Sequence, residues 1–183
     1  MRQACLRQPP TWGFGGAWSA LAQIMRGLDS GAVVLAAGGK LLTQWLREVR
    51  ALVDRAAARR GHPIRVGVRV PSEPGTALGL GLDAPTWARE GLVDLLVATP
   101  RWRTMHFDIP LRKWRALLGE RVTLAGGLES RCQPHPGAPV RHMDPECAAG
   151  AAVAVLSGGG DVVYLFNYFQ NAGWPAAEYQ RRL

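Results

Sequence analysis

The sequence contains few residues that could form a metal site or a disulfide framework. Its three cysteines, Cys5, Cys132 and Cys147, are far apart and include no CxxC pair, so we predict neither structural disulfides nor a zinc site. The four histidines show no HxxxH spacing. The Gly126-Gly127 pair lacks the GxGxxG spacing of a phosphate loop. We therefore predict no metal and no other cofactor.

Long apolar runs are also missing. The longest, Gly31–Gly39, is far shorter than the roughly 18 residues that a membrane span needs. Near the amino terminus Pro9, Pro10 and scattered glycines interrupt the apolar core that a signal peptide would require. We expect no membrane partner, and a cytoplasmic location for the sequence as it stands.

Lysine is scarce, because only two of the 22 basic residues, Lys40 and Lys113, are lysines. The net charge of +8 is therefore carried mostly by arginine. A charge of this sign would suit a polyanion. However, residues 1–62 hold nine basic and three acidic residues, whereas residues 63–183 hold thirteen and eleven. Because the more regular part is nearly neutral and carries no nucleic-acid-binding motif, we expect no nucleic-acid partner.

With 48% hydrophobic residues in 183, the chain can bury a core, but it is short for a complete (β/α)₈ barrel of roughly 250 residues. In Lys40–Arg60 apolar residues recur at three- and four-residue steps, which predicts a helix ended by Gly61. Gly31–Ala37 is either a short buried strand or the start of this helix. We interpret the rest of residues 1–39 as irregular.

Strands and helices alternate beyond this point. The predicted strands are Ile64–Val70, Val93–Ala98, Val122–Leu128 and Val162–Tyr168. The predicted helices run from Asp83 to Gly91, over Leu111–Leu118 and over Pro145–Ser157, the last with Asp144 as its cap and Gly158 as its stop. This alternation predicts an α/β fold with a parallel sheet.

Polar residues follow these strands. Arg69 ends the first strand, Glu129 follows the third and Asn167 lies near the end of the fourth, while His106 and Asp108 lie in the loop after the second. All are on the carboxyl side, where parallel α/β sheets bind ligands. We therefore expect a ligand site there.

A family resemblance is carried by the motifs VRVP, GLDAPTWAREGLVDLLV, FDIPLRKW, AGGLE and YLFNYF, in that order. Residues 40–171 resemble the C-terminal half of bacterial glycosyl-hydrolase-like proteins related to the family 10 glycosyl hydrolases, and residues 172–183 form a tail. The resemblance implies strands five to eight of a (β/α)₈ barrel, a carbohydrate ligand and hydrolysis of O-glycosyl bonds.

Barrels of that kind place one catalytic carboxylate after strand four and another after strand seven, and Glu129 matches the second position. The alternative for Glu129 is a solvated residue at the start of a loop. The strand-four motif, an acidic strand end followed by Arg-Phe-Pro, has no counterpart, since IMRGLDSGAVVLAAGG stands in its place. We therefore expect a truncated half-barrel that is weakly active or inactive and that forms a homodimer through its exposed strand edges.

The remaining candidates each allow a second interpretation. Asp108 could be the second catalytic carboxylate, or it could cap the following helix. Trp102 could stack on a sugar ring, and His106 could contact a sugar hydroxyl or be an ordinary surface histidine. Arg69 could hold a carboxylate or an anionic group, or pair with an acidic neighbour. Asn167 could bind substrate or cap the backbone.

Two other classes of function remain open. The chain could be a non-enzymatic α/β module that associates with itself through its edge strands, or a barrel half in which Arg69 and the strand-end loops hold a phosphate ligand. Trp87 and Trp114 lie on predicted helices at core spacing, so we assign both to packing rather than to ligand binding.

Overall fold

The structure, a computed structural model, describes residues 35–100, 107–133, 135 and 137–168. It divides into two compact units, the first reaching to Ile64 and including Leu80–Leu82, the second containing Arg65–Gly79 and the chain from Asp83 onward. The first unit contains helix α2 (Leu35–Arg60). None of the described helices is both long enough and apolar enough to cross a membrane.

Helix α2 ends where the sequence predicts. Gly61 adopts a φ of 71° and its N–H donates to the carbonyl of Ala57 at 2.9 Å, a backbone conformation that glycine reaches without steric cost. The helix starts before the predicted Lys40, so Leu35–Ala37 are helical rather than extended. Of the two alternatives for Gly31–Ala37, the start of the helix holds for Leu35–Ala37, and the interpretation as irregular is wrong for Gly38 and Gly39.

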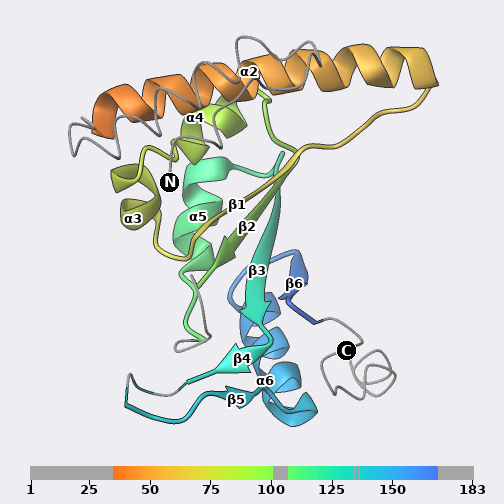
Figure 1. Ribbon diagram of the computed structural model, residues 1–183. Helices are drawn as coiled ribbons and strands as arrows, with labels where there is room; N and C mark the ends of the chain where they lie inside the picture. Colours follow the sequence, from red (N-terminus) through yellow and green to blue (C-terminus); the bar gives the residue numbers. More distant parts are fainter. Residues whose placement is uncertain (1–34, 101–106, 134, 136, 169–183) are drawn as a thin grey trace, which may run out of the picture. The chain divides into compact units, whose positions relative to one another are not determined.

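The second unit is built around a parallel sheet in the order β1-β2-β3-β6 (Figure 1). Its strands are β1 (Gly67–Pro71), β2 (Leu95–Thr99), β3 (Thr123–Glu129) and β6 (Val162–Phe166). Its helices are α3 (Pro74–Gly79), α4 (Ala84–Arg89), α5 (Leu111–Leu118) and α6 (Pro145–Ser157), and a hairpin of β4 (Arg131–Cys132) and β5 (Arg141–His142) follows β3. The predicted α/β fold with a parallel sheet is confirmed.

Aspartate side chains cap two of the helices, and Asp144 is the cap that the sequence predicts. The Asp83 carboxylate accepts the Thr86 N–H at 3.1 Å at the start of α4, and the Asp144 carboxylate accepts the Cys147 N–H at 2.7 Å at the start of α6. Each satisfies one amide that the first turn leaves without a helical partner. The expected ends of α5 and α6 are both observed.

The outer strands are shorter than predicted, for local reasons. Before β1, the N–H of Val66 donates to the Asp94 side chain at 2.7 Å, and the Val66 carbonyl accepts the Asp94 N–H at 2.8 Å. The ladder therefore starts at Gly67 instead of Ile64. At the other end Asn167 has a φ of 61°, which is incompatible with a strand, so β6 ends at Phe166.

Two adjacent glycines identify the faces of the sheet. A Cβ on Gly126 would lie 2.4 Å from a Val155 methyl of α6, whereas one on Gly127 would lie 2.5 Å from Cβ of Thr99 on the neighbouring strand. Because side chains alternate along a strand, Leu124 and Leu128 share the Gly126 face that α6 covers. Ala125, Gly127 and Glu129 share the other, which we call the Glu129 face.

Two elements were not predicted. Helix α3 has the sequence PGTALG, whose two glycines and six-residue length give no helical period. The β4-β5 hairpin consists of two-residue strands, which are too short to show alternation.

The two tryptophans assigned to packing are buried, Trp87 at 4% and Trp114 at 1% exposed. The Trp114 indole N–H donates to the Ser72 carbonyl at 2.7 Å.

Candidate functional site

Glu129 is the last residue of β3, and its side chain is buried. Only 3% of the residue is exposed, so the interpretation as a solvated glutamate at a loop start is wrong. Its Cα is paired with that of Phe166 on β6. The carboxylate therefore stands at the carboxyl end of the sheet, where parallel α/β folds bind their ligands.

Two neighbouring residues hold this carboxylate by hydrogen bonds. Ser130 donates its backbone N–H to Oε1 at 3.1 Å and its hydroxyl to the same oxygen at 3.3 Å. The amide nitrogen of Asn167 lies 3.0 Å from Oε1 and 3.2 Å from Oε2. Hydrogen bonds to an ionised group are stronger than neutral ones, so these donors offset part of the cost of burying the charge.

The backbone of β6 brings Asn167 to Glu129. The Ser130 N–H donates to the Phe166 carbonyl at 3.0 Å, which extends the contact between the two chain segments past the end of the strands. Asn167 then takes its positive φ of 61°, a conformation that asparagine tolerates better than most residues. The predicted site residues Glu129 and Asn167 thus meet directly, through an amide–carboxylate contact that the sequence did not predict.

Arg69 reaches across the Glu129 face. Its guanidinium carbon lies 3.7 Å from the centre of the Phe166 ring, although β1 and β6 are the two outer strands of the sheet. Three strand spacings of roughly 4.8 Å would separate these backbones by roughly 14 Å in a flat sheet. Both side chains must therefore extend over β2 and β3, where Val97 and Ala125 are buried.

The Arg69 contact is a cation–π interaction. Among the described residues Arg69 makes no ion pair with a carboxylate, so the predicted pairing with an acidic neighbour is wrong within that part of the chain. Stacking uses the face of the guanidinium and leaves its N–H edges available to a ligand. Tyr164 stacks beside Phe166 with ring centroids 6.5 Å apart.

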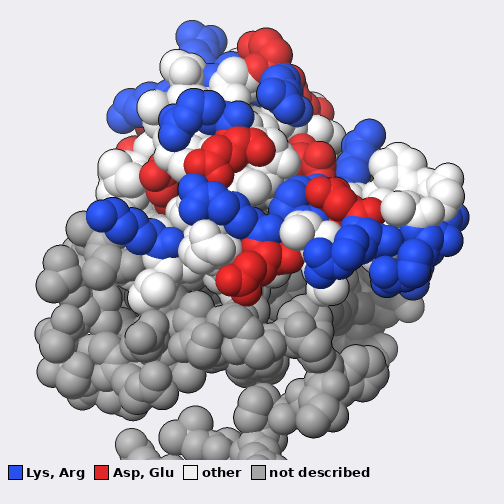
Figure 2. All heavy atoms as spheres, turned by 90° about the horizontal axis from the view of Figure 1, so that it is seen from above, with Lys and Arg blue, Asp and Glu red and all other residues white. Residues whose placement is uncertain are grey.

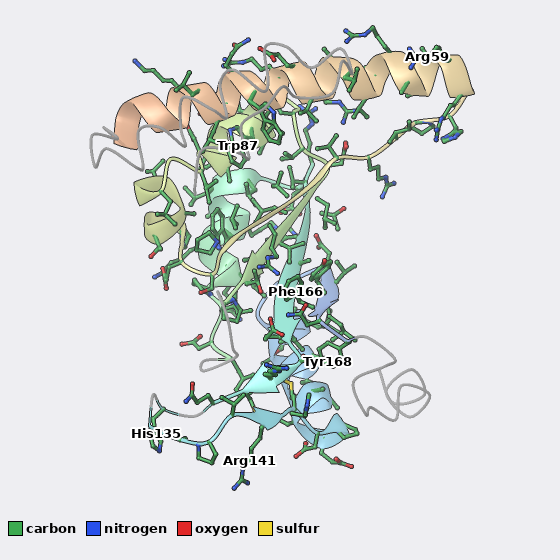
Figure 3. All side chains as sticks on the ribbon, viewed as in Figure 1. Arg59, Trp87, His135, Arg141, Phe166 and Tyr168 are labelled. Atoms are coloured by element: carbon green, nitrogen blue, oxygen red, sulfur yellow. The ribbon has the colours of Figure 1, made fainter. Side chains whose placement is uncertain are left out.

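Sequence reasoning missed Ser130, Thr99 and Phe166. Ser130 directly follows Glu129, and this adjacency was the available signal, because a hydroxyl next to a carboxylate can donate to it. Thr99, at the end of β2, is 4% exposed and packs against Gly127. Phe166, labelled in Figure 3, precedes Asn167 and pairs with Glu129 across the ladder.

Asp108 lies at a different place in the second unit. It is exposed and lines a cleft of about 640 Å³ beside the start of α5 and the end of α6. The residues that form this cleft include Arg112, Lys113 and Ser157 but neither Glu129 nor Asn167. Helix α5 is capped by Pro110 without a side-chain hydrogen bond, so the interpretation of Asp108 as its cap is wrong.

Trp102 and His106, the two candidates in the loop after β2, lie outside the described residues.

No family model and no curated protein matches this chain. The resemblance of its motifs to glycosyl-hydrolase-like proteins stays a prediction.

A second carboxylate, that of Asp161, links neighbouring segments of the sheet at the start of β6. Its carboxylate accepts the Leu124 N–H at 2.7 Å and an Arg115 N–H at 2.6 Å. The hydrogen bond from Leu124, and after it the interaction with Arg115, lowers the pKa of Asp161, although desolvation opposes the shift. Asp161 precedes its strand, whereas Glu129 ends one, so the two carboxylates lie at opposite ends of the parallel sheet.

Charged side chains of both signs lie on the face of the molecule that Figure 2 shows. Figure 2 shows acidic side chains between many of the basic ones on the face in view.

Within the described ranges, histidine, cysteine, aspartate and glutamate form no group of three that could hold a metal ion.

Proposed function

We propose that the chain is a carbohydrate-binding half-barrel of the glycoside-hydrolase type, with β1, β2, β3 and β6 in the positions of strands five to eight of a (β/α)₈ barrel. Two features support this assignment. The parallel strands follow one another without a reversal of order, as in a barrel and unlike a doubly wound sheet. Arg69 and Phe166, from the two outer strands, meet on the Glu129 face, which is the inner face of such a barrel.

The observation that carries the proposal is the buried Glu129 carboxylate, oriented by Asn167 and Ser130 at the carboxyl end of β3. A carboxylate fixed in this way can accept a hydrogen bond from a sugar hydroxyl, or act as nucleophile or base at an anomeric carbon. Arg69 supplies N–H donors and Phe166 an apolar surface nearby. This combination suits a sugar, which has both hydroxyls and apolar faces.

Hydrolysis needs a second carboxyl group, roughly 5–5.5 Å away in retaining enzymes and roughly 6.5–9.5 Å away in inverting ones. Asp108 lines the cleft beside α5 and α6 instead. In this proposal the chain is therefore weakly active or inactive as a hydrolase, and it forms a dimer in which the β1 edge of each copy pairs with the β6 edge of the other. A two-fold dimer of this kind covers both edges, because each contact is made twice.

Size-exclusion chromatography with light scattering tests the dimer. We expect twice the 19.8 kDa of one chain. A proline at Val163, on β6, would remove an edge N–H and should give monomers. A wild-type monomer across the accessible concentration range would contradict the dimer without bearing on sugar binding by Glu129.

A second candidate is a phosphate ligand, which the exposed N–H edges of Arg69 favour. A panel of neutral oligosaccharides and phosphate monoesters separates the two proposals. We expect the chain to bind oligosaccharides, and Arg69→Gln to weaken that binding less than tenfold. Binding of phosphate monoesters alone, abolished by Arg69→Gln, would replace the carbohydrate proposal.

A further inference from the structure

Two cysteines meet around one small buried cluster in the second unit. Cys132 ends β4 and Cys147 lies in the first turn of α6. Both are half-buried and pack against Met143 and Ala148, which are 1% and 0% exposed. Both thiols are free. The Tyr168 hydroxyl lies 3.5 Å from the Met143 sulfur on the same cluster, and Figure 3 labels Tyr168 in this region.

Backbone hydrogen bonds fix the segments that carry the two thiols. Cys132 pairs with Arg141 across the hairpin, and the Met143 N–H donates to the Ser130 carbonyl at 2.9 Å. The Cys147 N–H is held by the Asp144 carboxylate. The thiols are therefore presented to the same cluster by two anchored segments, although fourteen residues separate them along the chain.

The surroundings of Cys147 affect the ionisation of its thiol. Burial raises the pKa of the Cys147 thiol, and the negative charges of Cys132 and Asp144 raise it further. An electrostatic effect of one cysteine on the other agrees with the shared packing. Because its pKa is raised, the Cys147 thiol ionises less readily than an ordinary cysteine, and the thiolate is the form that attacks a disulfide.

We propose that Cys132 and Cys147 form a dithiol site that a small-molecule disulfide oxidises to an intramolecular disulfide. The Cys132 thiolate attacks one sulfur of glutathione disulfide, and one glutathione thiolate leaves. The Cys147 thiol then loses its proton and attacks the Cys132 sulfur of the mixed disulfide, releasing the second glutathione. Two protein thiols are oxidised and one glutathione disulfide is reduced to two thiols.

The site adjoins the residues that hold Glu129. Ser130 donates to the Glu129 carboxylate, and its carbonyl accepts the N–H of Met143 from the cysteine cluster. A disulfide would tie the hairpin that starts after Ser130 to helix α6. The inference concerns thiol chemistry alone, so it does not depend on carbohydrate binding.

The test uses the full chain with Cys5→Ser, which leaves only the two thiols in question. The reduced protein is incubated with glutathione disulfide, and the intact mass and the peptide map are recorded. We expect the loss of two hydrogen atoms and a peptide linking Cys132 to Cys147. Cys132→Ser and Cys147→Ser in the same background should each end with one bound glutathione.

A urea-unfolded sample of the Cys5→Ser chain shows whether the fold positions the thiols. We expect the folded chain to form the intramolecular disulfide at least tenfold faster, because its fold holds both thiols against the same cluster. Two glutathione adducts on the folded chain, without the linked peptide, would overturn the proposal. Equal rates in the folded and unfolded samples would overturn it as well.

Discussion

At residue 129 the chain buries a carboxylate that Ser130 and Asn167 hold by hydrogen bonds. A buried charge is costly unless donors surround it. An apolar side chain would fill this position at a lower cost in free energy, which is why we propose that Glu129 has a function. The sequence located Glu129 and Asn167 at strand ends, but their contact depends on the positive φ of Asn167, which no sequence pattern showed.

Two substitutions at Asn167 distinguish the contribution of its side-chain amide to stability from the contribution of its backbone conformation. Asn167→Gly removes the donor to Glu129 but tolerates the positive φ, so we expect a loss of about 1–3 kcal/mol in the free energy of unfolding. Asn167→Ala should lose about 1–2 kcal/mol more, because alanine is strained in this conformation. Urea unfolding measures both. A glycine variant as stable as the wild type would show that the amide contributes nothing.

The stacking of Arg69 on Phe166 predicts an energetic coupling between two strands that are not neighbours in the sheet. In a double-mutant cycle with Arg69→Met and Phe166→Leu we expect a coupling of about 0.5–1 kcal/mol, the range for a cation–π pair at an exposed site. The free energies of unfolding of the four proteins give this value. Strict additivity would mean that the contact does not stabilise the fold.

The lowered pKa of Asp161 predicts that the free energy of unfolding depends on pH. Its pKa is lowered in the folded chain, so its ionised form stabilises the fold above the unfolded-state value of about 3.9, and this contribution is lost as the pH falls through the folded-state pKa. Because the side chain is 47% exposed, we expect Asp161→Asn to cost only about 1 kcal/mol at pH 7. The gap to the wild type should close below about pH 4 in urea titrations. A constant gap would contradict the role of the charge.

At the scale of elements, periodicity and capping residues predicted α5 and α6 with their observed ends, and Asp144 as the cap of α6. Strand ends were predicted less well. The ladder at β1 is cut short by the Asp94 side chain, which takes the Val66 N–H, a tertiary contact that alternation of residue types does not encode. The contact of Arg69 with Phe166 was unpredictable for the same reason, since it joins residues from opposite edges of the sheet.

The close packing of α6 on β3 predicts that Gly126→Ala destabilises the fold. The new Cβ would lie 2.4 Å from a Val155 methyl, and relieving such overpacking costs about 1–3 kcal/mol. Val155→Ala creates space at the same point, so the double variant should lose less stability than the two single losses added together. Thermal or urea unfolding of the three variants decides this. Additive losses would contradict the packing of Val155 against Gly126.

At the scale of the whole molecule, a parallel sheet in sequential order leaves β1 and β6 as edges among the described strands. Unpaired edges favour association, and the Glu129 face lies between them. The proposed dimer and the proposed sugar site therefore concern the same face. The proposed function depends on whether Glu129, rather than the more accessible Asp108, contacts the ligand.

The most direct test is the affinity of wild type, Glu129→Gln and Asp108→Asn for one oligosaccharide that the wild type binds, measured by isothermal titration calorimetry. Both substitutions replace a carboxylate by an amide of the same shape, and Asp108→Asn is the matched control in the separate cleft. We predict at least tenfold weaker binding for Glu129→Gln, the loss of about 1.4 kcal/mol or more, and unchanged binding for Asp108→Asn. Unchanged binding by Glu129→Gln would contradict the account, as would a loss confined to Asp108→Asn.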